Sequence, residues 1–153
     1  MAKKSGKVNT QPFWRFLFVV YCAVMLWLLF GQRVGQSAGS WNLEPFDTLW
    51  RYIWVLKYST DGEQRLHAVI NLAGNVVMFV PLGFFVPCIW RRFRNFAWHF
   101  LTMTGIIVII ELLQLLTQLG TCDIDDLMLN LVGTTMGFCL YRLVKRLMHS
   151  VML

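Results

Sequence analysis

The chain has 153 residues, of which 57% are hydrophobic and only 14% are charged. A soluble domain carries about 25% charged and about 45–50% apolar residues, so a soluble chain this short would leave much apolar surface in water. The composition therefore excludes an ordinary soluble domain and predicts a membrane protein. The formal net charge of +6 would suit nucleic-acid binding, but the positions of the charges favour a different explanation.

Hydropathy predicts four membrane-spanning helices, because each span needs about 20 mostly apolar residues. We expect an all-α membrane protein with one domain, residues 1–153, and spans at 13–30, 67–89, 97–119 and 127–144. The first span is not predicted to be a cleavable signal peptide. Its apolar stretch is too long, and no small-residue cleavage site follows it.

The loop between the first two spans contains a segment with helical periodicity. Pro45 stands where a helix can begin. The large apolar residues that recur on one face are Phe46, Leu49, Trp50, Ile53 and Trp54. Residues 45–58 are therefore predicted to form a short amphipathic helix that lies in the interface or folds back into the bilayer. A membrane anchor and a lid over a site are both open interpretations of this helix.

Basic residues predict the orientation of the chain. Four spans place ten of them on one side: Lys3, Lys4, Lys7, Arg15, Arg91, Arg92, Arg94, Arg142, Lys145 and Arg146. Because basic loops are retained in the cytoplasm, both termini are predicted to be cytoplasmic. This distribution explains the net charge as a topology signal, and no nucleic-acid partner is expected.

Polar side chains inside the spans are the candidate functional residues, because such groups are unfavourable in hydrocarbon. Glu111 lies well inside the third span, and Gln114 shares its helix face. In the second span His67, Asn71 and Asn75 follow one another at intervals of four residues and form one polar stripe. At 1.5 Å per residue, Glu111 and Asn75 should both lie roughly 12 Å below the outer end.

Aspartates crowd the entrance to the fourth span. Asp123, Asp126 and Asn130 share one helical face, and Asp125 lies between the two aspartates. Polar stripes of three helices thus end in the same outer half of the membrane, which predicts a wet pocket that opens outward. Its predicted ligand-binding residues are His67, Asn71, Asn75, Glu111, Gln114, Asp123, Asp126 and Asn130.

Each polar residue also has a structural interpretation. One of the three aspartates could cap the fourth helix, and the amides could be interhelical hydrogen-bond partners. Glu111 could be a neutral hydrogen-bond donor, and His67 a solvated surface residue. Asp123, Asp125 and Asp126 are weak candidates for holding Mg²⁺ or Ca²⁺. Since no recognised metal motif is present, no cofactor is expected.

Small residues predict close helix packing. Gly133 and Gly137 form a GxxxG pattern that lets two backbones approach each other. Gly74, beside Asn75, is expected to act in the same way. Pro81 is expected to bend the second span near its middle, and Pro87 to kink or end it.

The polar residues belong to an ordered series of short motifs, in which x is any residue. The series is Asn42-Leu43-x-Pro45-Phe46, Asn75 with Pro81-x-Gly83, Glu111-x-x-Gln114, and Asp123-x-x-Asp126-x-x-x-Asn130-x-x-Gly133-x-x-x-Gly137. Over residues 42–137 this series resembles the VanZ-like family. Many relatives carry a basic residue where this chain has Thr121, and Arg51 or Arg65 of the outer loop could replace it as the charge partner of the aspartates.

The resemblance implies a role at the outer face of a bacterial plasma membrane. VanZ itself is associated with low-level resistance to teicoplanin, a lipoglycopeptide antibiotic. The resemblance supplies no reaction, and it does not imply that every member confers resistance.

Three functional hypotheses follow from these residues. In the first, the pocket binds the polar group of a membrane lipid, a cell-wall precursor or a lipoglycopeptide. In the second, a membrane enzyme uses Glu111 as an acid or base together with Asp123 and Asp126, so these three are the catalytic candidates. The third is a small ion-coupled transporter, which the absence of an internal repeat disfavours. Whether the protein is an enzyme, and its oligomeric state, stay open.

Overall fold

Helices make up most of the computed structural model, which describes residues 11–31 and 41–151. The elements in chain order are α1 (Gln11–Leu26), the π-helical turn η1 (Trp27–Gly31), β1 (Trp41–Asn42), α2 (Asp47–Tyr58), α3 (Gly62–Ile89), the 3₁₀ turn η2 (Arg91–Arg94), α4 (Phe96–Leu116), β2 (Cys122–Asp123) and α5 (Ile124–Val151). The predicted helix of the outer loop is thus present as α2, which begins at Asp47 rather than at residue 45.

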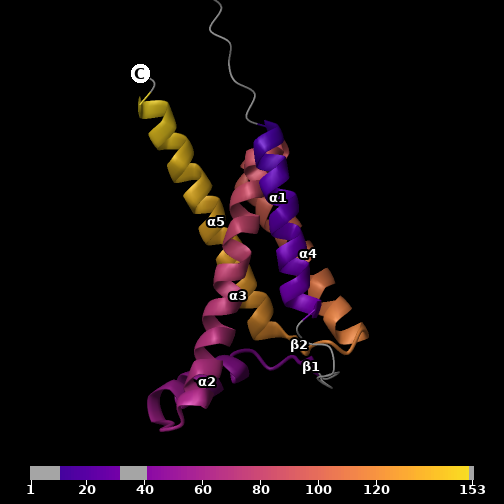
Figure 1. Ribbon diagram of the computed structural model, residues 1–153, viewed down its shortest axis with the longest axis vertical. Helices are drawn as coiled ribbons and strands as arrows, with labels where there is room; N and C mark the ends of the chain where they lie inside the picture. The colour runs from indigo at the N-terminus through magenta and orange to yellow at the C-terminus, as the bar shows by residue number, and fades with distance from the viewer. Residues whose placement is uncertain (1–10, 32–40, 152–153) are drawn as a thin grey trace, which may run out of the picture.

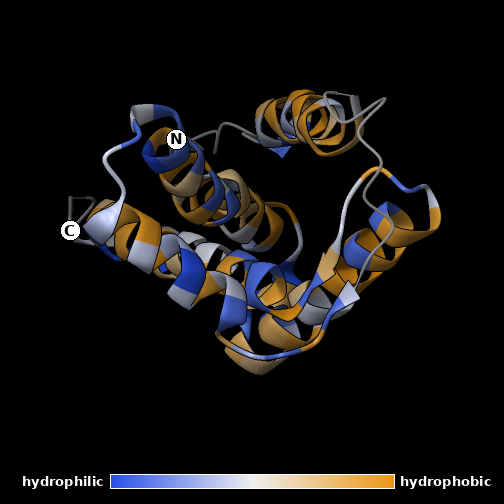
Figure 2. Cartoon of the chain, turned by 90° about the horizontal axis from the view of Figure 1, so that it is seen from below, coloured by the Kyte–Doolittle hydropathy of each residue, from blue (hydrophilic) through white to orange (hydrophobic). Residues whose placement is uncertain are grey.

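Four of these helices are long and apolar enough to cross a membrane, which confirms the predicted all-α membrane fold. They are α1 together with η1, α3, α4, and Ile124–Met148 of α5. Large apolar side chains project outward from them, and Phe16, Leu101 and Leu116 are each more than 60% exposed. Figure 2 shows the predominantly hydrophobic colouring of these helices in a view along the long axis. Lipid is the solvent that such surfaces require.

The described part of the chain begins and ends at the same end of the molecule (Figure 1). The start of α1 and the C-terminus lie at the top of that view, whereas α2, β1 and β2 lie at the bottom. We call these the basic end and the α2 end. The basic end carries Arg91, Arg92, Arg94, Arg142, Lys145 and Arg146.

A glycine seam holds α3 against α5. A Cβ atom on Gly133 would lie 2.2 Å from the carbonyl oxygen of Val76, and one on Gly137 would lie 2.0 Å from that of Val80. From the other helix, a Cβ on Gly83 would meet the backbone of Thr134 at 2.0 Å. The predicted GxxxG contact is therefore present, since only glycine permits backbones this close.

Gly74 does not belong to this seam, so the prediction made for it is wrong. A Cβ there would meet nothing within 4 Å. The sequence pattern fails because a glycine favours close packing only where its face of the helix meets another backbone, and Gly74 faces open space.

Both prolines of the second span lie inside α3, which continues to Ile89. Just past this end, Arg94 of η2 donates from Nε to the carbonyl oxygen of Pro87 at 3.2 Å. The last carbonyls of a helix lack partners within the helix, so this bond completes the end of α3 and fixes the Arg94 side chain beside it. Apolar residues of α1, η1, α3 and α4 form the buried core below, namely Met25, Leu29, Phe79, Leu82, Val86, Met103 and Ile107.

Candidate functional site

Two short strands join the outer loop to the start of α5. β1 pairs in parallel with β2, with Trp41 opposite Cys122 and Asn42 opposite Asp123. The pairing places the Asn42-x-x-Pro45-Phe46 motif directly beside the aspartates that precede and open α5. Two motifs that are about 80 residues apart in the sequence thus form one structural unit.

Asp125 fixes the start of α2. Its carboxylate accepts hydrogen bonds from the backbone N–H of Phe46 at 2.7 Å and from that of Leu49 at 3.0 Å. Phe46 itself, at the N-cap position of α2, provides no side-chain cap and has a left-handed φ of 70°. A carboxylate at a helix N-terminus satisfies free N–H groups and complements the helix dipole. Asp125 of α5, which is fully buried, therefore caps α2, a helix that is distant from it in the sequence.

Thr48 connects α2 to the other aspartate of this unit. Its buried hydroxyl donates to Oδ2 of Asp123 at 2.6 Å and accepts from Asn42 at 3.1 Å and Arg51 at 3.0 Å. The other oxygen of Asp123 accepts from the backbone N–H of Asp125 at 2.9 Å, which is the contact of an N-cap for α5. The predicted capping role of one aspartate thus belongs to Asp123, and the guanidinium of Arg51 approaches the cluster through Thr48.

We call Asn42, Thr48, Asp123 and Asp125 the α2 junction. No role is predicted for Thr48 from the sequence, although its position two residues after Phe46, at the end of the Asn42–Phe46 motif, is a usable signal. Arg51 was expected as a charge partner for the aspartates, and the structure brings it to within hydrogen-bonding distance of their neighbour Thr48.

A second set of polar residues lies where α3, α4 and α5 meet. Asn75 of α3 donates from Nδ2 to Oδ1 of Asp126 on α5. One turn further along the same face of α5, Asn130 donates to Oε1 of Glu111 on α4 over a long 3.4 Å. We call Asn75, Glu111, Asp126 and Asn130 the interhelical polar group. Glu111 is only 4% exposed and Asn130 only 3%, so both side chains face the protein rather than lipid.

Gln114 turns away from this group. Its buried amide donates to the carbonyl oxygen of Leu29 at 3.4 Å, and Leu29 lies in the π-helical turn at the end of α1. Because a π turn disturbs the usual helical hydrogen-bond pattern, this amide stabilises the end of the first span. The contact assigns Gln114 a role in packing α1 against α4.

His67 and Asn71 contact each other near the start of α3. The Asn71 amide lies 2.9 Å from Nδ1 of His67 and donates to the His67 carbonyl oxygen at 2.9 Å. His67 is exposed and Asn71 is partly so. The hydrogen bonds of the described residues do not connect this pair to the interhelical polar group, although the three residues His67, Asn71 and Asn75 form one stripe in the sequence.

The α2 junction offers little to a metal ion. Oxygens of Asp123 and Asp125 accept hydrogen bonds from backbone N–H groups and from the Thr48 hydroxyl. Across residues 11–31 and 41–151, no group of three His, Cys, Asp or Glu side chains is arranged to hold a metal ion.

The thiol of Cys122 lies close enough to Glu111 and Asp123 for their charges to affect its pKa. Partial burial raises the pKa of its thiol, and the negative charges of Glu111 and Asp123 raise it further. A thiol with a raised pKa is protonated at neutral pH and is a poor nucleophile. Cys122 therefore reports on the local charge rather than serving as a reactive group.

Fold and site together define a multi-pass α-helical membrane protein in which a capped amphipathic helix lies next to a buried group of carboxylates and amides. The family model described as VanZ/LLP1 matches residues 17–145, and the chain belongs to this family. The match confirms the resemblance carried by the motifs at residues 42–137. Searches of the curated proteins and of the solved structures find no match to this chain.

Proposed function

We propose that this protein recognises the polar headgroup of an amphiphile at the outer face of a bacterial plasma membrane. The basic residues gather at the end opposite α2 (Figure 1), and basic ends are retained in the cytoplasm. Both termini would then be cytoplasmic, and α2 would lie at the outer surface. In this orientation the interhelical polar group would lie within reach of molecules in the outer leaflet.

The buried acceptors of the interhelical polar group are the observation that carries this proposal. Asn130 is 3% exposed, and its Oδ1 has no hydrogen-bond partner among the described residues. Buried polar atoms are nearly always satisfied, so this oxygen calls for a hydrogen-bond donor. A ligand that fits here would offer hydrogen-bond donors, such as hydroxyl, amine or amide groups.

The α2 helix and the neighbouring β1 supply the apolar side of the proposed site. Trp41, Trp50 and Trp54 are each more than 60% exposed, and tryptophan favours the membrane–water interface. The α2 junction holds this aromatic surface against α5. A ligand with an acyl chain and a donor-rich headgroup would match both surfaces, and cell-wall precursors and lipoglycopeptides are of this kind.

Binding of this kind would alter the access of a lipoglycopeptide to its target, and we propose this as the link to teicoplanin resistance. The test is ligand binding by the full chain in lipid nanodiscs, with teicoplanin and a lipid-linked cell-wall precursor as probes. Asn130→Ala removes the acceptor that the ligand would satisfy, and it should weaken binding about tenfold, as expected for one lost hydrogen bond with an unsatisfied donor.

Asn71→Ala is the matched control, because it changes the same residue type at a position outside the group. It should leave binding unchanged. Failure of the wild-type protein to bind either probe would overturn the proposal, and so would equal losses in the two variants.

Glu111→Gln separates binding from the two alternatives. Glutamine keeps the side-chain volume and an acceptor oxygen but removes the charge and the ability to transfer a proton. A binding protein should retain most of its affinity. An enzyme that uses Glu111 as acid or base, or a proton-coupled transporter, should lose its activity while it stays folded.

A further inference from the structure

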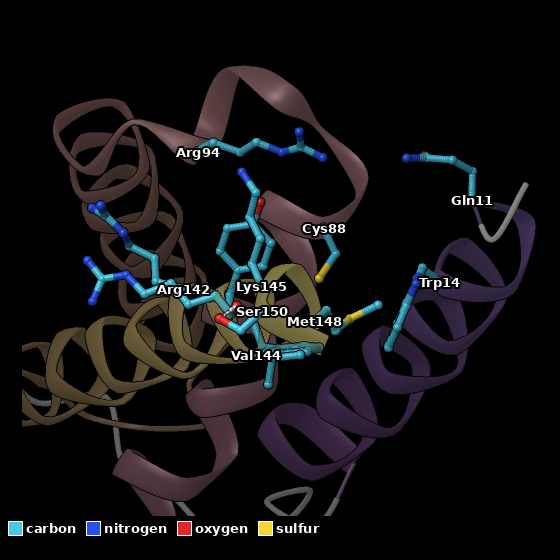
Figure 3. Close-up of a pocket in the computed structure, with 12 residues that line it drawn as sticks. Gln11, Trp14, Cys88, Arg94, Arg142, Val144, Lys145, Met148 and Ser150 are labelled. Atoms are coloured by element: carbon cyan, nitrogen blue, oxygen red, sulfur yellow. Dashed lines mark hydrogen bonds between the residues drawn. The ribbon is translucent and has the colours of Figure 1, made fainter. Parts of the chain in front are cut away.

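A large cavity opens at the basic end, far from both polar clusters. Its volume is about 960 Å³, near the upper end of the range of about 300–1,000 Å³ that is usual for small-molecule sites. Residues from α1, α3, η2 and α5 line it. Figure 3 shows Arg94 above the cavity, Arg142 and Lys145 on α5, and Gln11 and Trp14 across the opening on α1.

The glycine seam explains why the cavity exists. α5 lies against α3 at Gly133 and Gly137, but it contains no glycine beyond that point. Larger residues follow, and α5 diverges from α1 toward its C-terminal end (Figure 1). The space between the two diverging helices becomes the cavity.

Charge in this cavity has one sign. Four of its lining residues are cationic, and none of the described residues that line it is acidic: the cations are Arg94, Arg142, Lys145 and Arg146. The topology signal alone requires basic residues at this end, but it does not require four of them to line one cavity. Arg91 and Arg92 serve topology equally well and lie outside the lining, where Arg92 stacks on Trp98 at 4.4 Å.

The floor of the cavity is apolar. Trp14 packs edge-on against Phe84, with ring centroids 5.8 Å apart, and Val144 and Met148 add aliphatic surface. Tyr141 also lines the cavity. It is 7% exposed, and its hydroxyl has no hydrogen-bond partner among the described residues. A buried hydroxyl of this kind can donate to an anionic oxygen.

We propose that this cavity binds one anionic phospholipid, with the phosphate near the cationic side chains of the lining and the acyl chains along the apolar floor. Basic pockets between spans on the cytoplasmic side are suited to acidic headgroups. The chain itself offers no counter-ion in the preceding segment, because Lys3, Lys4 and Lys7 in residues 1–10 carry the same sign of charge. This site is separate from the one proposed at the α2 end and does not depend on it.

The first experiment measures lipid retention by the full chain, using native mass spectrometry after exchange into mixed phosphatidylglycerol and phosphatidylcholine. The wild-type protein should retain phosphatidylglycerol preferentially. The double variant Lys145→Gln/Arg146→Gln should retain it about tenfold less well. The control Arg91→Gln/Arg92→Gln removes the same charge from the same end but lies outside the cavity, and it should behave like wild type.

Equal losses of phosphatidylglycerol retention in the two double variants would show that general surface charge retains the lipid. That result would overturn the proposal. Equal retention of the two lipids by the wild type would overturn it as well. A third arm adds inorganic phosphate or glycerol phosphate in excess. If either displaces phosphatidylglycerol, the site recognises a soluble anion and the lipid assignment is wrong.

Cys88, which lines the cavity, gives a readout that needs no substitution. A bound lipid should protect it from a small membrane-permeant maleimide, so its labelling in phosphatidylglycerol nanodiscs should be several-fold slower than in phosphatidylcholine. Cys22 is also half-buried but lies outside the lining, and its labelling should not differ. Equal labelling of Cys88 in the two lipids would contradict the proposal.

Discussion

The two ends of α5 use charge in opposite ways. At the α2 end, Asp123 and Asp125 accept hydrogen bonds from this chain's own backbone and hydroxyl groups. At the basic end, four cationic residues line a cavity that has no acidic residue in its described lining. The aspartates find their hydrogen-bond donors within the protein. The cations of the cavity have no acidic partner in the described lining, so we expect them to bind an anion from outside the chain.

The comparison teaches that clustered charge in a membrane protein is not by itself a sign of a binding site. The aspartates at the start of α5 are the most conspicuous polar residues of the sequence, yet two of them hold helices in place. The basic residues look like a routine topology signal, yet four of them line the cavity. A charged cluster is structural where the chain itself supplies its hydrogen-bond or ion-pair partners. It is a candidate binding site where the chain does not.

We expect the largest effect from a substitution in the glycine seam, because the seam positions α5, which contributes residues to both ends of the molecule. Gly137→Ala puts a methyl group 2.0 Å from the carbonyl oxygen of Val80, and backbone cannot move aside cheaply. We expect a loss of about 1–3 kcal/mol or more in the free energy of unfolding, measured by denaturant titration in detergent.

Gly74→Ala is the control for this change, because a Cβ there meets nothing within 4 Å. It should be neutral or stabilise the protein by up to about 1 kcal/mol through better helix propensity. Wild-type stability for Gly137→Ala would mean that the seam is looser than its geometry indicates.

Removal of the cap from α2 should have a smaller and more local effect. Asp125→Ala leaves the N–H groups of Phe46 and Leu49 without their acceptor, which should destabilise α2 by about 2 kcal/mol. Hydrogen exchange at these two amides should accelerate, and trypsin should cut faster at Arg51 and Lys57.

Asp61→Ala removes a similar cap from α3, where Asp61 accepts from the N–H groups of Glu63 and Gln64, and it should leave α2 protected. Lipid retention at the basic end should not change in Asp125→Ala. If that retention falls together with the protection of α2, the two ends are coupled and the contrast between them fails.

The smallest expected effect concerns the thiol of Cys122. Burial and then the charges of Glu111 and Asp123 raise its pKa. Glu111→Gln removes one negative charge, which lowers the pKa and increases the thiolate fraction at a fixed pH. Alkylation of Cys122 at pH 8 should therefore rise about twofold.

Burial should still keep this pKa above its ordinary range in the variant. Glu63→Gln, at an exposed position, should not alter the rate. An unchanged rate in Glu111→Gln would show that Glu111 does not act electrostatically on Cys122.

Local patterns in the sequence account for the features that were predicted well. Hydropathy over about 20 residues defines a span, so the four spans were predicted with bounds a few residues from those observed. The helical rise and periodicity placed Asn75 and Glu111 at one depth, and both now belong to the interhelical polar group. The pattern of Gly133 and Gly137 likewise predicted a close helix contact.

Contacts between distant segments account for what was missed. The pairing of Trp41–Asn42 with Cys122–Asp123 involves two residues on each side, too few for any periodic signal. The carboxylate of Asp125 is visible in the sequence, and it made this residue a weak candidate for metal binding. Its actual partners are two backbone N–H groups, which leave no signal in the sequence because nearly every residue has one. The cavity at the basic end depends on the angle between α1 and α5, which no pattern in either helix specifies.

The cap on α2 also has a consequence for synthesis of the protein. Asp125 follows Phe46 by 79 residues. At about 5–20 residues per second, the ribosome needs roughly 4 to 16 seconds to add it after Phe46. During that interval α3 and α4 are also synthesised, so the start of α2 stays uncapped until the first turn of α5 has been made.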